Sequence, residues 1–175
     1  MQKNPFWFPL KVKNNKEVNV LNKLLKNGYK AYLPLERYSI QKGERVFWKL
    51  RPVFKGKLFI NCSFLDLDKI CSENADVKFY GKAGNQEFLQ EGEINFLKKA
   101  LASTQNLVLT SKDLDTTVFL NIQNEEYGDI TIFSCEYKEE DFYVWKIPVI
   151  NINLLIESDN NFMKYLVLDF QESIA

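Results

Sequence analysis

Two clusters of carboxylates are the residues of this chain whose type and spacing could do chemistry. Asp66-Leu67-Asp68 has the DxD spacing with which some sugar transferases bind a metal ion, and Glu139-Glu140-Asp141 is a second acidic run. The first lies at the start of an expected helix, where exposed N–H groups and the helix dipole favour carboxylates. The second lies in an expected turn between strands. We therefore expect both clusters to be structural, and an enzyme using these carboxylates is the weakest of three functional hypotheses.

The residues on which many enzymes and metal sites depend are missing. The chain has no histidine, so neither a Ser-His-Asp triad nor a Cys-His pair can form. Its three cysteines, Cys62, Cys71 and Cys135, contain no CxxC pair, whereas a structural zinc site usually needs four Cys or His ligands. Gly81-Lys82-Ala83-Gly84-Asn85 lacks the Lys-Ser/Thr of a phosphate-binding loop. We predict a protein that is not an enzyme, binds no metal, needs no cofactor and buries its cysteines.

The charge of the chain is strongly segregated, although its net value is zero. Residues 1–110 hold 19 Lys and Arg against 10 Asp and Glu, a net of +9, whereas residues 111–175 hold 4 against 13, a net of −9. Residues 1–60 alone carry 14 basic and 3 acidic residues. This segregation indicates two units with different partners, of which the basic one suits nucleic-acid phosphates or an acidic protein surface. The acidic unit could also dock on the basic one and mask it.

No segment has the features of an export signal or a membrane span. The start of the chain has one lysine before a short apolar patch that Pro9 interrupts. No apolar run approaches the ~20 residues of a membrane helix. We expect a cytoplasmic protein with no membrane partner.

The basic part of the chain predicts alternating strands and helices. Residues 6–13 form an aromatic-rich strand in which Pro9 suggests an edge or a bulge. The elements that follow are a helix at 16–27, a strand at 31–35, a hairpin centred on Gly43 within 36–50, a strand at 53–62, a helix at 66–73, a strand at 77–81 and a helix at 91–102. This order predicts an α+β fold, a ferredoxin-like α/β sandwich, over residues 1–104.

After a polar linker at 105–116, the apolar residues alternate with a period of two. The alternation runs through Val118, Leu120 and Ile122, then Ile130 and Ile132, then 142–147 and 150–156, and a last strand is expected at 164–170. Four or five short strands in this length predict a small β-barrel over residues 117–175.

Five pieces of the first part, kept in order and spacing, carry a resemblance to a known family. They are Trp7-Phe8, Lys13 before Lys16-Glu17, Gly28-Tyr29-Lys30-Ala31-Tyr32-Leu33-Pro34-Leu35, Arg51-Pro52-Val53-Phe54-Lys55-Gly56-Lys57-Leu58-Phe59-Ile60, and Val77 to Gly81 followed by Glu91-Gly92-Glu93-Ile94. Over residues 6–102 the chain resembles the N-terminal domain of NusG-type transcription termination and antitermination factors.

The second part resembles that family less closely. A NusG-type protein carries an SH3-like barrel with a KOW motif here, but of the glycines that mark the motif only Gly128 could remain, and acidic residues replace its basic turn. The resemblance therefore implies a degenerate KOW-like barrel. It also implies a specialised, operon-restricted paralogue of the RfaH or UpxY type.

The resemblance implies an apolar hollow on the first domain that receives the tip of the RNA polymerase clamp helices. The matching residues are Phe54, Phe59, Tyr80, Ile94 and Leu97. A few buried rings can supply most of the affinity for a docked helix. Equally, these residues could be the core of the fold, and Lys57 stands where the family prefers an aromatic residue.

The resemblance also implies two nucleic-acid surfaces. Lys13, Lys16, Asn19 and Lys23 match the surface that meets the non-template DNA strand, where lysines contact phosphates without reading sequence. The 36–50 hairpin matches one that can reach upstream duplex DNA, through Arg37, Lys42, Arg45 and Lys49. Trp48 could stack on an unpaired base, although we prefer the interpretation that it pins the hairpin to its own domain.

Together these observations favour a transcription elongation or antitermination factor that binds the polymerase clamp and contacts DNA at the transcription bubble. Its acidic part could bind a ribosomal or regulatory protein. The alternative, from a different class, is a nucleic-acid-binding module that acts in translation or RNA processing. A plain binder should hold nucleic acid alone, with a steep dependence on salt, whereas a polymerase adaptor should need the enzyme.

Overall fold

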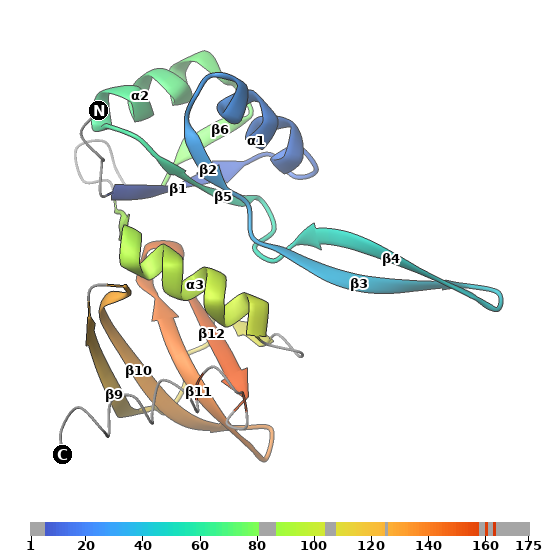
Figure 1. Cartoon of the computed structure of the whole chain (residues 1–175), viewed down its shortest axis with the longest axis vertical. Coiled ribbons are helices and arrows are strands. Elements are labelled where there is room, and N and C mark those ends of the chain that lie inside the picture. The colour runs from blue at the N-terminus through green and yellow to red at the C-terminus, as the bar shows by residue number, and fades with distance from the viewer. Residues whose placement is uncertain are drawn as a thin grey trace. The chain divides into compact units, whose positions relative to one another are not determined.

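A computed structural model describes residues 6–80, 87–103, 108–124 and 126–157, together with residues 160 and 163. The chain forms two compact units, Met1–Leu89 and Gln90–Ala175, and each is described by itself (Figure 1). The sequence suggested a division at residue 104. In the structure the division falls earlier, before the helix α3 (Glu91–Ser103). The short strand β7 (Leu89–Gln90) lies at the division.

The first unit is built on an antiparallel sheet of β1 (Phe6–Val12), β2 (Lys30–Tyr32), β5 (Lys57–Asn61) and β6 (Val77–Phe79). These four strands follow the order β2-β5-β1-β6, and the short strand β7 also pairs with β1, so that β1 and β5 are central. The expectation that Pro9 marks an edge strand is wrong. Pro9 pairs with Phe59 of β5, while β6 pairs only with Leu10, Lys11 and Val12.

Two helices, α1 (Glu17–Lys26) and α2 (Phe64–Glu73), cover one face of this sheet (Figure 1). The core between them comes from alternate strand residues and from one stripe of each helix, namely Phe8, Leu10, Leu58 and Ile60 with Val20, Leu24, Leu67 and Ile70. Strand residues alternate between faces and helix residues recur every three or four positions, so the apolar pattern itself selects this face.

The strands β3 (Leu35–Lys42) and β4 (Arg45–Pro52) form a separate two-stranded hairpin that extends away from the sheet (Figure 1). Its register runs without a shift from the Leu35–Pro52 pair to the Lys42–Arg45 pair. Gly43 begins the two-residue turn with a φ of 62°, a left-handed value that glycine adopts without strain. The predicted hairpin is therefore present, centred where the sequence placed it.

The second unit holds a five-stranded antiparallel sheet and α3. The strands are β8 (Val108–Thr110), β9 (Thr117–Asn124), β10 (Gly128–Tyr137), β11 (Glu140–Ile147) and β12 (Ile152–Glu157), with a 3-10 turn at Pro148–Ile150. The ring of Phe96 on α3 lies 5.8 Å from that of Tyr127 and 5.1 Å from that of Trp145. A Cβ on Gly92 would come within 2.3 Å of the Tyr127 backbone, so only glycine allows this approach.

The opposite face of this second sheet is also apolar. Cys135, Phe142, Val144 and Leu155 form a cluster there, and partly buried Phe133 and Tyr137 pack against it. Cys62 and Cys135 are buried as expected, and Cys71 is half-buried.

The predicted closed barrel is not confirmed by the described strands. They follow the open order β8-β12-β11-β10-β9, and α3 packs against the sheet through β10. The predicted linker also contains a strand, because β8 pairs with β12 as its edge strand. Residues 104–107 and the strand expected at 164–170 lie outside the described residues.

Candidate functional site

The first sheet has a second face, opposite α1 and α2, on which the predicted polymerase-binding rings lie. By alternation, Trp7, Pro9 and Lys11 of β1 point away from the core formed by Phe8, Leu10 and Val12. Cross-strand register adds residues of the neighbouring strands to the same face, namely Lys30, Tyr32, Lys57, Phe59, Asn61 and Lys78. We call these nine residues the second face.

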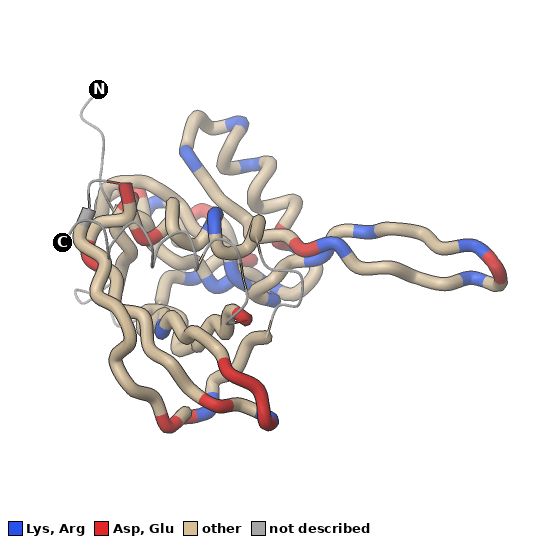
Figure 2. Tube along the Cα trace, turned by 60° about the horizontal axis from the view of Figure 1, so that its bottom comes forward, with Lys and Arg blue, Asp and Glu red and all other residues tan. Residues whose placement is uncertain are grey.

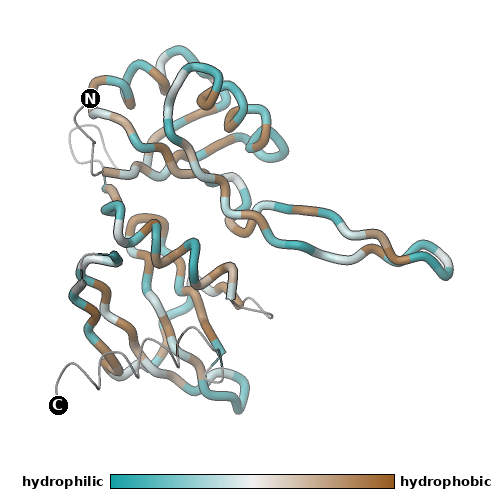
Figure 3. Tube along the Cα trace, viewed as in Figure 1, coloured by the Kyte–Doolittle hydropathy of each residue, from teal (hydrophilic) through white to brown (hydrophobic). Residues whose placement is uncertain are grey.

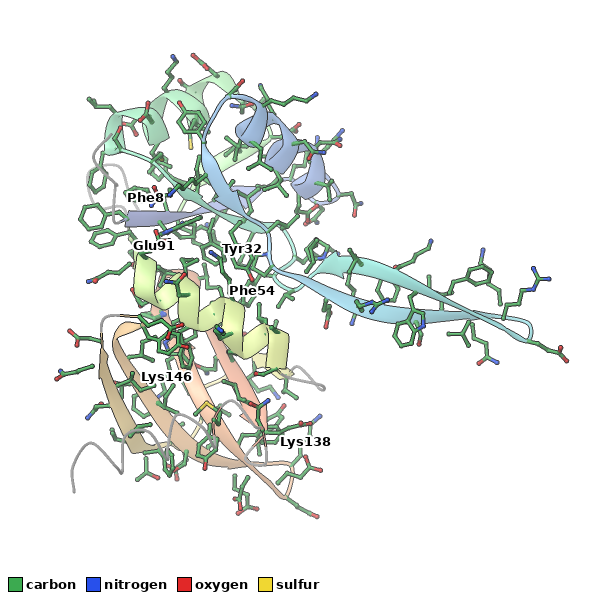
Figure 4. All side chains as sticks on the ribbon, viewed as in Figure 1. Phe8, Tyr32, Phe54, Glu91, Lys138 and Lys146 are labelled. Carbon is green, nitrogen blue, oxygen red and sulfur yellow. The ribbon has the colours of Figure 1, made fainter. Side chains whose placement is uncertain are left out.

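Aromatic side chains gather at the β2–β5 end of the second face. The rings of Phe54 and Phe59 meet edge to face, with centroids 6.2 Å apart, and that of Tyr32 stacks 6.4 Å from Phe59. Tyr32 and Phe54 lie where the chain passes between the sheet and the hairpin (Figure 4). Burial raises the pKa of Tyr32 to about 12. The structure thus brings Phe54 and Phe59 together.

Both predicted rings are buried, since Phe54 is 1% and Phe59 0% exposed. This burial is what a residue of the core would show, and a partner could reach the rings only after they become accessible. Ile94 and Leu97 are also fully buried, but they lie on α3 and belong to the second unit. Helical spacing places them on a side of α3 different from that of Phe96 and Ala100.

Three lysines form one row on the second face, across β5, β1 and β6. Lys11 lies directly opposite Lys57 on one side and Lys78 on the other. Like charges in direct cross-strand register repel each other. Burial and the nearby Lys11 ammonium lower the pKa of Lys57. The row is therefore a concentrated positive charge that an anionic partner would stabilise.

Tyr80, the remaining predicted polymerase-binding residue, lies beside this row. The Lys11 ammonium is 4.7 Å from the centre of its ring. Burial raises the pKa of Tyr80 to about 12. Tyr80 thus contacts the lysine row through Lys11.

The predicted nucleic-acid residues of α1 lie together on its exposed side. Lys16, Asn19 and Lys23 line a shallow hollow whose other wall is formed by the end of α2 and the loop to β6. The Lys23 ammonium donates a hydrogen bond to the Asn74 side-chain oxygen. Lys13 is exposed before α1, and its backbone N–H donates to the Asp76 carbonyl at 2.9 Å. Glu73 and Asp76 also line the hollow, so its charge is mixed.

The hairpin carries most of the predicted charge in an exposed position, and Figure 2 shows its Lys and Arg residues along both strands and near the tip. Its two faces differ. Directly paired residues share a face, which gives one face with Glu36, Tyr38, Ile40, Lys42, Arg45, Phe47, Lys49 and Arg51. We call it the cationic face. The other, the apolar face, holds Leu35, Arg37, Ser39, Gln41, Val46, Trp48, Leu50 and Pro52.

The register separates the four predicted hairpin residues. Lys42, Arg45 and Lys49 lie on the cationic face, whereas Arg37 lies on the apolar face, with its guanidinium 5.6 Å from the centre of the Trp48 ring. Trp48 is 63% exposed, so the expectation that it pins the hairpin to its domain is wrong. Sequence reasoning missed Phe47 and Arg51. Counting alternate residues outward from Lys42 and Arg45, which flank the two-residue turn, would have grouped them with the three cations.

Both carboxylate clusters lie at the elements that the sequence predicted, a helix start and a turn between strands. The Ser63 hydroxyl caps α2 by accepting from the Asp66 N–H at 3.1 Å, and it donates to the Asp66 carboxylate at 2.7 Å. Lys138 and Glu139 form the turn between β10 and β11, both with positive φ. The described residues contain no group of three potential metal ligands. Among the described helices, none is long and apolar enough to cross a membrane.

Comparison with known proteins identifies the first part of the chain. The family model described as transcription termination factor NusG matches residues 5–98. A search of curated proteins found no match. The matched segment spans more than half of the 175 residues and contains α1, the hairpin, α2 and the whole second face. The chain therefore belongs to the NusG family of transcription termination factors.

Proposed function

We propose that this protein is an operon-specific elongation and antitermination factor, which binds the clamp helices of RNA polymerase and contacts DNA at the transcription bubble. The observation that carries the proposal is the family match over residues 5–98. A NusG-family protein is a transcription termination or antitermination factor, and such factors typically bind RNA polymerase. Its action would be binding alone, in the cytoplasm, without a cofactor or catalysis.

The second face is the surface we assign to the polymerase. It combines the aromatic rings of Phe54 and Phe59 with the lysine row that crosses β5, β1 and β6. A helix that presents apolar residues next to acidic ones would fit both groups, because buried rings supply affinity and opposite charges supply orientation. Since Phe54 and Phe59 are buried in the chain, the proposal requires that they become accessible when the polymerase binds. Ile94 and Leu97 remain candidates on the same grounds.

Pull-down of core RNA polymerase by the full chain tests this assignment. Substituting Phe54 or Phe59 risks unfolding the protein, so the lysine row offers a cleaner variant. We expect Lys57→Glu to weaken binding by at least about tenfold, because the new carboxylate would repel an acidic partner. Lys55→Glu, two residues away and exposed, is the matched control and should bind like the wild type. Equal binding by both variants would remove the second face from the interface.

The DNA contacts are assigned to α1 and the hairpin. The non-template strand would contact Lys13, Lys16, Asn19 and Lys23. Upstream DNA would contact the hairpin residues Lys42, Arg45 and Lys49, with Arg37 on the hairpin's other face. The exposure of these side chains supports this assignment. The acidic pair Glu73 and Asp76 beside Lys16 and Lys23 argues for a limited contact there, since carboxylates repel phosphates.

The second unit is proposed to bind a basic surface on a ribosomal or regulatory protein. Its acidic residues gather at the β10–β11 turn, where Glu136, Glu139, Glu140 and Asp141 follow one another (Figure 2). We also propose that the first unit is a ferredoxin-like sandwich, supported by its strand order β2-β5-β1-β6. The open order of the second sheet gives no support to a KOW barrel.

The second candidate function is a nucleic-acid module of translation or RNA processing. The exposed cations of the hairpin favour it, because they need no polymerase to bind a strand. Affinity separates the two. A stand-alone binder should hold free nucleic acid far more tightly than the ~10⁻⁴–10⁻⁶ M of non-specific contacts at physiological salt. A polymerase adaptor should remain in that weak range and gain its affinity from the enzyme.

A further inference from the structure

The cationic face of the hairpin is divided along its length. At its base, the Arg51 guanidinium pairs with the Glu36 carboxylate at 2.6 Å and lies 5.0 Å from the centre of the Tyr38 ring. The charge of Arg51 is therefore already paired with Glu36 and packed on Tyr38. Toward the tip, Lys42, Arg45 and Lys49 are exposed, and none of them forms an ion pair with another residue that the structure describes. The outer half is therefore the part free to bind an anion.

Phe47 lies between these three cations. It pairs with Ile40, and the cations occupy the rungs immediately before and after, Lys42 with Arg45 and Lys49 with Tyr38. Phe47 is 45% exposed, although a phenyl ring without a partner gains free energy from burial. Neighbouring rungs on one face are two residues apart, about 7 Å along the strand. Positive charge thus alternates with an exposed ring along the face.

This alternation suits one kind of nucleic acid better than another. In an unpaired strand, phosphates alternate with bases, and proteins bind such strands with cations for the backbone and aromatic rings on which bases stack. In an intact duplex the bases already stack on each other, so Phe47 would find no partner. The chemistry of the face therefore favours an unpaired strand.

The apolar face provides a natural comparison. Its ring, Trp48, is even more exposed than Phe47, but Arg37 is the one charged residue on that face and its guanidinium already lies over the ring. A strand placed there would meet one cation where the cationic face offers three. Figure 3 shows the apolar residues that alternate with hydrophilic ones along both strands.

We infer that the outer half of the cationic face binds an unpaired nucleic-acid strand, with Lys42, Arg45 and Lys49 on its phosphates and one base stacked on Phe47. This inference deepens the nucleic-acid contact of the proposed function. It nevertheless stands apart from the polymerase assignment, because it concerns free strands and needs no enzyme. Unpaired DNA and RNA share the required chemistry.

Fluorescence anisotropy with the full chain tests the inference. The probes are a labelled 12-nucleotide DNA of mixed sequence, the RNA of the same sequence, and the blunt DNA duplex. We expect weak binding of a single strand, on the order of 10⁻⁵ M, and weaker binding of the duplex at the same salt. Tighter binding of the RNA or of the DNA would identify the natural strand. Duplex binding as tight as that of both single strands would overturn the inference.

Phe47 variants separate stacking from folding. We expect Phe47→Ala to weaken single-strand binding by about five- to a hundredfold, the range found for one base stacked on an aromatic ring. Phe47→Trp should restore binding, since it restores a ring. Trp48→Ala, on the apolar face of the same hairpin, should bind like the wild type. A loss in Trp48→Ala equal to that in Phe47→Ala, or no loss in Phe47→Ala, would contradict the assignment.

The cations are tested by salt dependence. Each phosphate contact in a single strand contributes ~0.7 to the slope of log affinity against log salt, so the triple variant Lys42→Gln, Arg45→Gln, Lys49→Gln should lose about 2 from the slope. The matched control is Lys30→Gln, Lys55→Gln, Lys69→Gln, which removes the same charge from exposed positions elsewhere in the first unit. An equal change of slope in both triples would show that only net charge matters and would overturn the inference.

Discussion

The sheet of the first unit and the hairpin that extends from it are built from similar residues but differ in what surrounds them. Both contain aromatic and aliphatic residues together with lysines. In the sheet, Leu58, Phe59 and Ile60 are fully buried, whereas in the hairpin Phe47, Trp48 and Leu50 are 45%, 63% and 61% exposed. A pattern of residue types therefore indicates a strand but does not indicate what covers it. Rings in the sheet stabilise the fold, and rings in the hairpin are available to a partner.

Two leucine substitutions should separate the regions most clearly. Leu58→Ala should lower the free energy of unfolding by about 2–5 kcal/mol, because it leaves a cavity between the sheet and the helices. Leu50→Ala, the same change in the hairpin, should alter it by less than about 0.5 kcal/mol. Urea unfolding followed by circular dichroism measures both. Similar losses in the two variants would mean that the hairpin is packed as the sheet is.

Two glycine substitutions extend the comparison to the second unit, with a smaller effect. Gly92→Ala should cost about 1–3 kcal/mol, since its Cβ would overlap the Tyr127 backbone and force α3 away from it. Gly43→Ala has open space around it, and its left-handed φ should cost about 1 kcal/mol, mostly within the hairpin. Thermal unfolding of both variants checks this order. A Gly43 variant less stable than the Gly92 variant would contradict it.

Most elements of the first unit could be predicted from local patterns. The helix expected at 16–27 is found at Glu17–Lys26, and the hairpin turns at Gly43 as expected. Each of these depends on periodicity or on turn chemistry, both of which are local in sequence. The burial of Phe54 and the exposure of Trp48 could not be predicted in this way, because they depend on which other segments lie nearby in space.

Several features of the second unit could not be predicted from local sequence patterns. Apolar residues lie on more than one side of α3, so its sequence alone did not indicate that Phe96 packs against Trp145, 49 positions later. The strand β8 lies within the segment predicted as a linker, where Val108 and Leu109 are too few for alternation to indicate a strand, and its pairing is with β12, which is distant in sequence. Alternation predicted strands in 117–157 correctly but could not predict whether their sheet closes.

The candidate binding surfaces were also predicted only in part. The family resemblance selected Lys42, Arg45 and Lys49, which the structure places on one face. It also selected Arg37, which lies on the other, and it overlooked Phe47 between the cations. The lysine row of Lys11, Lys57 and Lys78 spans three strands that are separate in sequence, so only the register of the sheet reveals it.

Single-round transcription by RNA polymerase, on a template with a pause and a terminator, tests the central claim most directly. At saturating concentration the full chain should shorten the pause or increase read-through of the terminator, and Lys57→Glu should lose this effect while Lys55→Glu keeps it. An unchanged pause and unchanged termination, with polymerase and protein both present in excess, would contradict the assignment of this chain as an elongation and antitermination factor.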